Sequence, residues 1–420
     1  MSYFDDWRTL FSSWRGDVIA GVTVGIVALP LALGFAITTG APASAGLSTA
    51  IIAGFVAALF GGSNYQVSGP TGAMTVVLVP IVATYGLGAL PALGIAAGLF
   101  IIALALFRLG RFIDRVPLSV MEGFTLGIAL IIALQQIPLI FEVPKASGSH
   151  IVSVALDTLQ DVLSHDIHWT SLLLALGTLI TKGSWPRIKR LLKIKFHVPA
   201  SAIAVLLLSL LSFAFNLDVN RIGELPRSLE FDFSFNFPDI PIVEFLYAAL
   251  VIAALGAIES LLSARVADGM AHQEIDHERP KHQPNKELFG QGLATIASVF
   301  SGGLPATGAI ARTSVNVHSG ARTRLSAMVH ALFLLLVVLI FAPIVAYIPT
   351  AVLAGVLLGT SLRIANPRSV REALQTTSSQ RLIYCATAFA VLFIDLIWGV
   401  VIGIALDVIV KKISSRSATK

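Results

Sequence analysis

The stretch Gln66–Thr75, QVSGPTGAMT, interrupts one of the most apolar parts of this sequence. It holds two glycines, a proline and three hydroxyl side chains, which together make a poor start for a helix. In lipid, a backbone N–H group without a partner is unfavourable, so irregular backbone at membrane depth must line a cavity or be buried in protein. The stretch therefore predicts a functional break wherever its surroundings cross a membrane.

Those surroundings are typical of a membrane protein. Between Val18 and Phe107 there are 90 residues without an Asp, Glu, Lys or Arg, enough for about four spans of ~20 residues each. A second charge-free run extends from Leu325 to Leu362. A β-barrel would alternate polar and apolar residues instead. The sequence therefore predicts an all-α polytopic membrane protein.

Hydropathy and Gly/Pro breaks predict fourteen spans. They are expected near residues 17–38, 45–61, 69–84, 89–108, 116–138, 168–182, 197–216, 241–266, 286–301, 307–319, 325–343, 349–362, 381–394 and 396–411. With both termini cytoplasmic, the external loops carry only Lys145, Arg221 and Arg227, as the positive-inside rule expects. We therefore expect a multi-pass protein of the inner (cytoplasmic) membrane, whose basic residues face the membrane surface and imply no nucleic acid partner.

Two patterns recur in the two halves of the chain. VPLSVMEGFTLG begins at Val116 and IPTAVLAGVLLG at Ile348, and the Ser68-Gly69 stretch is echoed by Ser301-Gly302 at nearly the same offset. Because each half holds an odd number of spans, the second must enter the membrane from the opposite side, which gives an inverted repeat. The predicted division is a cytoplasmic segment 1–15, a first repeat 16–240, a second repeat 241–411 and a cytoplasmic tail 412–420.

Both halves therefore carry a Gly/Pro-interrupted start of a short span. The third and tenth spans are expected to be half-helices that begin near Pro70 and Thr307. Helix N-termini carry free N–H groups and about half a positive charge, so two of them facing one pocket form an anion site. Arg312, a charge at membrane depth, favours the same site; the alternative is a structural partner for a carboxylate or for the carbonyl groups at a helix C-terminus.

Glu259 is the acidic residue deepest in a predicted span. It could exchange a proton, coordinate Na⁺ together with Ser263, or pair with Arg312, and the spacing does not decide among these roles. The polar loop that follows contains His272, His277 and His282 among acidic residues, which we interpret as solvated. No metal site and no cofactor are predicted.

In these motifs the chain resembles the SulP anion transporters, also called solute carrier family 26. The resemblance extends to RGDVIAGVTVGIVALPLALGFAITTG from Arg15, GAIESLLSARVADGM from Gly256 and GLPATGAIARTSVNVHSGARTRLSA from Gly303. It implies a seven-plus-seven inverted repeat with core and gate domains, an elevator-like movement between them, and a homodimer. Spans 5–7 and 12–14 would form the gate. Family members usually continue into a STAS domain, and none is expected before the chain ends at Lys420.

The resemblance also implies the site residues. Phe35 would form part of the pocket wall, and Thr71, Gly72 and Ala73 would form one half-helix end. The other end would be formed by Gly308, Ala309, Ile310, Ala311, Arg312 and Thr313. Glu259 and Ser263 would couple an ion to transport.

The expected function is secondary active transport of a small anion across the membrane. We expect proton-coupled symport of a dicarboxylate such as fumarate. Sodium-coupled bicarbonate transport, proton-coupled sulfate transport and a channel-like mode are the alternatives. An intramembrane enzyme would need facing catalytic groups such as two Asp in separate spans, and we recognise none, so an enzyme is not expected.

Overall fold

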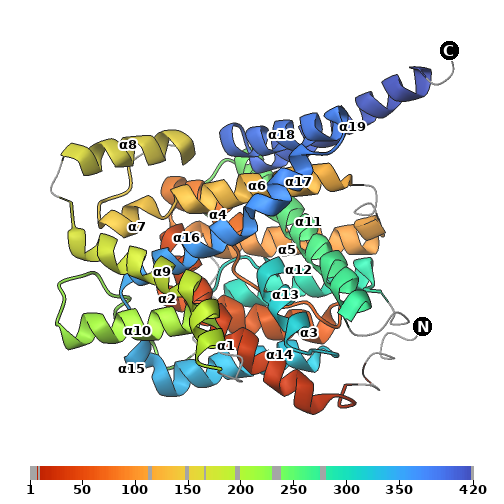
Figure 1. Ribbon diagram of the computed structural model, residues 1–420. Helices are drawn as coiled ribbons and strands as arrows, with labels where there is room; N and C mark the ends of the chain where they lie inside the picture. Colours follow the sequence, from red (N-terminus) through yellow and green to blue (C-terminus); the bar gives the residue numbers. More distant parts are fainter. Residues whose placement is uncertain are drawn as a thin grey trace.

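The protein is almost wholly helical in the computed structural model, which describes Trp7 and residues 10–111, 116–146, 151–164, 167–193, 199–228, 238–274 and 281–417 (Figure 1). The first half contains α1 (Trp14–Thr39), α2 (Ala43–Ser48), η2 (Thr49–Ala53), α3 (Gly54–Phe60), β1 (Ser68–Gly69), α4 (Gly72–Tyr85), η3 (Leu87–Ala89), α5 (Leu90–Leu106), α6 (Leu118–Leu134), α7 (Ile137–Phe141), α8 (Ile151–Ser164), α9 (Trp169–Leu191) and α10 (Ala200–Ala214). The second half contains α11 (Ile242–Glu274), α12 (Pro284–Phe300), β2 (Thr307–Gly308), α13 (Ile310–His318), α14 (Leu325–Leu336), η5 (Val337–Phe341), α15 (Ala342–Val345), α16 (Thr350–Ile364), α17 (Pro367–Leu374), α18 (Ser378–Phe393) and α19 (Leu396–Ser417).

Helical residues cover most of each predicted span. Among the described residues, 6 helical stretches are long and apolar enough to cross a membrane, and α4 and α10 are shorter apolar helices. The protein is therefore a multi-pass helical membrane protein, while the count of fourteen spans stays a prediction.

Two local expectations were wrong. The span predicted at 116–138 ends as α6 at Leu134, and α7 begins at Ile137 with Pro138 in its first turn, where the missing N–H of proline is tolerated. The predicted external loop that follows contains α8, which buries Val154, Ala155, Thr158 and Val162 on one face. The other face of α8 is polar, so the mean hydropathy of this helix is too low to predict a membrane span.

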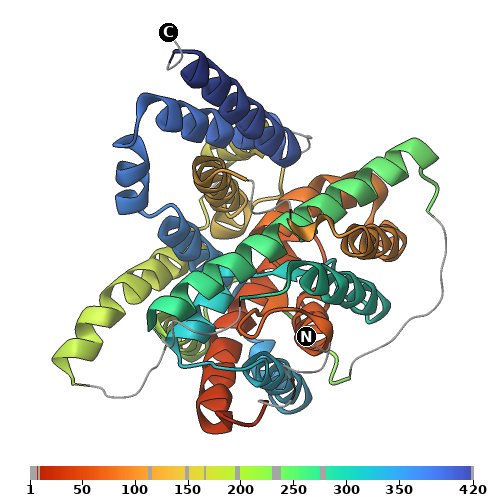
Figure 2. The ribbon, with the colours of Figure 1, turned by 90° about the vertical axis from the view of Figure 1, so that its right-hand side faces the viewer.

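The helices form two groups by their mutual contacts. In group one, α5 packs on α11 and α12, α1 packs on α14, and α12 packs on α3. In group two, α18 packs on α6 and α19, and α9 packs on α10 and α16. Figure 2 shows the blue C-terminal helices standing apart from the long green α11 and the orange α5. The groups meet where α4 contacts α6 and where α1 contacts α10 and α16.

At the centre of group one, two short strands cross. β1 pairs antiparallel with β2, with Ser68 opposite Gly308 and Gly69 opposite Thr307. The half-helices α4 and α13 follow, and they begin at Gly72 and Ile310, two or three residues later than predicted. Antiparallel pairing of these corresponding segments is what an inverted repeat predicts; the repeat itself stays a prediction.

The polar side chains of α12 hold both strands in place. Gln291 donates from Nε2 to the carbonyl of Ala306 at 2.8 Å and accepts from the Ser68 hydroxyl at 2.9 Å. The buried Glu287 accepts from the N–H groups of Gly62 and Ser63 at 2.8 and 2.9 Å. These bonds satisfy backbone and side-chain groups that lipid would leave unpaired.

Candidate anion-binding site between two half-helices

A cavity of about 500 Å³ lies where the two helix groups meet, at the N-terminal ends of α4 and α13. Group one supplies most of the polar wall, and α6 and α16 of group two supply the opposite wall. Nine of the predicted site residues line it: Phe35, Thr71, Gly72, Ala73, Glu259, Ala309, Ile310, Ala311 and Arg312.

The other three predicted residues lie behind the cavity wall. The N–H of Gly308 donates to the Ser260 hydroxyl at 3.0 Å. The Thr313 hydroxyl accepts from Ser263 Oγ at 3.1 Å and from the N–H of Val67 at 3.1 Å. These residues therefore support the strand crossing, and they do not reach the cavity.

Both half-helices present free backbone N–H groups to the cavity. In the part of the chain that the structure describes, the N–H groups of Gly72, Ala73, Ile310, Ala311 and Arg312 donate to no protein oxygen. The first N–H groups of a helix have no partner within the helix, and they attract negative charge. The geometry of the two ends is therefore that of an anion site.

Arg312 adds a full positive charge to this wall. Its side chain is 1% exposed, and its Nη2 donates to the carbonyl of Pro70 at 2.6 Å, so α13 is tied to the segment that leads into α4. Within the described residues its Nη1 is buried without a hydrogen-bond partner. A buried charge without an ionic partner is strongly unfavourable, and its field favours an anion in the cavity.

Gly69 makes room for this arginine. A Cβ atom at Gly69 would lie 2.2 Å from Arg312 Nη1, far inside van der Waals contact. Gly69 of the QVSGPTGAMT stretch is therefore required, because the guanidinium group of Arg312 approaches the backbone closely at this position.

Glu259 lies between the two half-helices. Its Oε2 accepts from the hydroxyls of Thr71 at 2.8 Å and Thr307 at 2.7 Å, and the two hydroxyl oxygens are 2.9 Å apart. Each of these three short oxygen–oxygen contacts needs one proton to be a hydrogen bond. The two hydroxyl groups supply one proton each, so an ionised Glu259 leaves one contact without a proton. A protonated Glu259 supplies the third proton, and the arrangement fits a carboxyl group that takes up and releases a proton.

The structure separates Glu259 from two partners considered at the sequence level. Ser263 bonds to Thr313 rather than to Glu259. Among the described residues no ion pair joins Glu259 to Arg312. The carboxyl group and the guanidinium thus line the same cavity without neutralising each other directly.

One histidine interpretation was wrong. The His282 side chain is 7% exposed, and its Nδ1 lies 2.7 Å from Asp268 Oδ2. Its side chain is a buried partner of Asp268 in α11 rather than a solvated loop residue. His277 lies outside the described residues.

The sequence analysis missed several residues of the site. Arg363 and Thr360 of α16 also line the cavity, and Gln66, Ser260 and Gln291 hold the strand crossing from behind. The available signal for Arg363 was its position as the first charged residue after the charge-free run Leu325–Leu362. The supporting residues gave no comparable signal, because isolated Ser and Gln residues are common in membrane helices.

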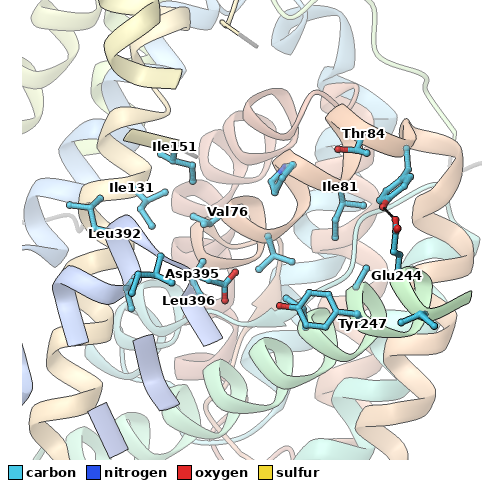
Figure 3. Close-up of a pocket in the computed structure, with 18 residues that line it drawn as sticks. Val76, Ile81, Thr84, Ile131, Ile151, Glu244, Tyr247, Leu392, Asp395 and Leu396 are labelled. Carbon is cyan, nitrogen blue, oxygen red and sulfur yellow. Dashed lines mark hydrogen bonds between the residues drawn. The ribbon is translucent and has the colours of Figure 1, made fainter. Parts of the chain in front are cut away.

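A separate cavity of about 570 Å³ lies further along α4 (Figure 3). Val76 and Ile81 of α4 and Tyr247 of α11 face Leu392, Asp395 and Leu396 at the α18–α19 junction across it. Its charged lining residues are Glu244 and Asp395, and Glu244 Oε2 accepts from the Tyr85 hydroxyl at 2.5 Å. This acidic cavity shares no lining residue with the cavity at Arg312.

Fold and cavity together define a polytopic membrane protein with a candidate anion site between the starts of α4 and α13. Residues 14–387 match the model of the sulfate permease family, and the chain therefore belongs to this family, also called SulP. It is an anion transporter of that family and not an enzyme.

Individual relatives agree with this assignment. The chain is 37% identical over 404 residues to the "Putative sulfate transporter YvdB" of Bacillus subtilis, covering 94% of this chain and 72% of the relative. It is 34% identical over 408 residues to the "Bicarbonate transporter BicA" of Picosynechococcus sp., covering 94% of this chain and 69% of the relative.

Solved structures show the same fold. The transmembrane domain of a cyanobacterium bicarbonate transporter BicA superimposes with a TM-score of 0.80 at 32% identity, covering 95% of this chain and 98% of that one. The overall structure of SLC26A9 gives 0.79 at 17% identity over 95% of this chain and 67% of that one, which is a likeness of fold alone.

Proposed function

We propose that the protein is a secondary active transporter that couples uptake of a small anion to protons, with a dicarboxylate such as fumarate as substrate. One observation carries this proposal: Arg312, the free N–H groups of both half-helices and Glu259 line a single cavity. The positive groups bind the anion, and the carboxyl group between Thr71 and Thr307 carries the proton. A cavity of about 500 Å³ is large enough for a dicarboxylate.

The arrangement of the cavities supports alternating access. The cavity at Arg312 shares Leu31, Ser314, Val315, Thr360 and Arg363 with a neighbouring cavity of about 480 Å³, which lies beside the basic end of α9. Its path therefore leads to the side that the positive-inside rule places in the cytoplasm. In this proposal group one is the core that carries the anion, group two is the gate, and the core moves like an elevator.

Further parts of the proposal follow from the family. The protein would work as a homodimer in the inner (cytoplasmic) membrane, with both termini in the cytoplasm. Thr313 and Ser263 would contribute by holding the strand crossing from behind, and Phe35 by walling the cavity.

A second candidate function rests on the relatives. YvdB and BicA are described as sulfate and bicarbonate transporters, and both anions would also fit two helix ends and one arginine. Proton-coupled sulfate transport and sodium-coupled bicarbonate transport are therefore the alternatives. The three-oxygen arrangement at Glu259 favours a proton over Na⁺, because the proton completes its hydrogen bonds.

Uptake of labelled fumarate, sulfate and bicarbonate into proteoliposomes tests this proposal. Each anion is offered with an inward proton gradient, with an inward Na⁺ gradient and with neither. The proposal predicts that fumarate uptake is driven by the proton gradient and is indifferent to Na⁺. Uptake of bicarbonate alone, driven by Na⁺ alone, would contradict both the substrate and the coupling ion.

A further inference from the structure

The cavity beside the basic end of α9 has a lining unlike that of the site at Arg312. Its volume is about 480 Å³, and it is bounded by α1, α9, α13, α16 and the start of α10. Its basic residues are Lys182, Lys189, His318 and Arg363, and no Asp or Glu is among the residues that line it. We call this space the basic vestibule.

Two of these cations lie close together. Lys182 Nζ donates to the carbonyl of Val356 at 2.7 Å and to the Thr360 hydroxyl at 3.0 Å, which fixes the ammonium group against α16. Arg363 lies one turn of α16 beyond Thr360, the residue whose hydroxyl accepts from Lys182, and both cations line the same cavity. Among the described residues, no carboxylate forms an ion pair with either cation.

Lys182 is partly buried and Arg363 is exposed, and both line the same cavity without a counter-ion. A bound anion offsets the repulsion between these like charges and pairs with the remaining donors of both groups. We propose that Lys182 and Arg363 form a second anion-binding station, which a small inorganic or carboxylate anion occupies on its way between Arg312 and the cytoplasm. This station rests on the proposed function only in that the same anion also occupies the transport site.

Arg363 connects the two stations. It lines both the basic vestibule and the cavity at Arg312, as do Thr360 and Ser314. Lys182, Arg363 and Arg312 therefore line one continuous path for the anion between the transport site and the cytoplasm. The acidic cavity of Figure 3, with Glu244 and Asp395, offers no such station on its side of α4.

Anomalous scattering from bromide is a direct test. Crystals of the whole protein are soaked in sodium bromide, and the same is done with Arg312→Gln and with the double variant Lys182→Gln/Arg363→Gln. We expect wild type to show one peak near Arg312 and one between Lys182 and Arg363. Arg312→Gln keeps the vestibule peak, and the double variant loses it.

The possible outcomes separate this proposal from the proposed function. No bromide between Lys182 and Arg363 in wild type, or a peak there that persists in the double variant, overturns the second station. A vestibule peak without any peak near Arg312 supports the second station and contradicts the transport site.

Transport kinetics with the anion offered at the cytoplasmic face provide a second readout that a merely structural role would not give. Because clefts of one charge raise the local concentration of counter-ions, Lys182→Gln and Arg363→Gln should each raise the KM measured from this face by about threefold to tenfold with kcat unchanged. The matched control is Arg190→Gln, which removes a charge from α9 outside the vestibule lining. If the vestibule variants and Arg190→Gln have the same KM, the station does not exist.

Discussion

The two half-helices both begin at the same cavity and differ in what they present to it. α4 has 14 residues, none of them charged, and the Thr71 side chain caps it by accepting from the N–H of Met74 at 3.3 Å. α13 has 9 residues, no side-chain cap, and Arg312 in its first turn. One half thus supplies a neutral helix dipole, and the other supplies the charge that reaches across to Pro70.

In the proposed function, this difference makes the pair of helix ends specific. Two identical ends would bind any small anion weakly. The arginine from α13 can approach only because Gly69 in the opposite strand leaves room for it. We therefore propose that the second half recognises the charge and that the first half contributes the space.

Gly69→Ala should produce the largest effect. The added Cβ would displace Arg312 Nη1, and hydrogen bonds to charged groups contribute about 1.5–3 kcal/mol, so KM should rise about tenfold to a hundredfold. Gly308→Ala, at the corresponding point of the second strand, meets the Gln66 amide at 2.3 Å instead. It should lower the melting temperature with a much smaller change in KM.

The uptake assay of purified Gly69→Ala and Gly308→Ala checks this contrast. Gly88→Ala serves as the control, because a Cβ there meets nothing within 4 Å. Equal KM values for Gly69→Ala and Gly308→Ala would show that the arginine does not depend on the space in β1.

Glu259→Gln should abolish the coupling of anion transport to the proton gradient, while the two half-helices stay in place. The amide oxygen still accepts from Thr71 and Thr307, but the side chain no longer releases a proton. Each pH unit of gradient is worth about 1.4 kcal/mol per proton, so wild type should accumulate the anion about tenfold per unit. Glu259→Gln should equilibrate the anion without accumulation, at a rate independent of pH.

The control for coupling is Glu244→Gln, which removes a carboxylate from the acidic cavity of Figure 3. Accumulation should persist in this variant. Proton-driven accumulation by Glu259→Gln would assign the coupling proton to another group.

The smallest expected effect is a difference in melting temperature between variants of the two threonines that contact Glu259. Thr71→Val removes both a bond to Glu259 and the cap of α4, whereas Thr307→Val removes only the bond to Glu259 and the contact with Thr71. Loss of a cap costs about 1 kcal/mol, so Thr71→Val should melt a few degrees lower than Thr307→Val. Thermal unfolding of both purified variants in detergent measures the difference. Identical melting temperatures would show that the Thr71 side chain does not stabilise the N-terminus of α4.

Much of the site could be predicted because lipid makes irregular backbone and buried charge conspicuous. Gly69, Pro70 and Arg312 stand out against long apolar runs, and the structure places them in contact. Glu259 was found for the same reason. The side chains of Phe35 and Ala73 were assigned through the family resemblance, and both line the cavity.

The rest depends on tertiary contacts without a local pattern. Ser263 was expected beside Glu259 because the two lie one turn apart, but its hydroxyl faces Thr313. α8 was missed because an amphipathic helix has too little hydropathy to register as a span. Lys182 and Arg363 come from helices far apart in sequence, so only packing of α9 on α16 reveals them as neighbours.

The most direct test of the anion site is uptake of labelled fumarate, sulfate and bicarbonate by purified Arg312→Gln, beside wild type, in proteoliposomes without any gradient. Equal melting temperatures would show that the variant is folded. The account predicts that the anion taken up by wild type enters the Arg312→Gln vesicles at least about tenfold more slowly at low concentration, because the desolvated charge that binds it is gone. Uptake at the wild-type rate would mean that the anion binds elsewhere.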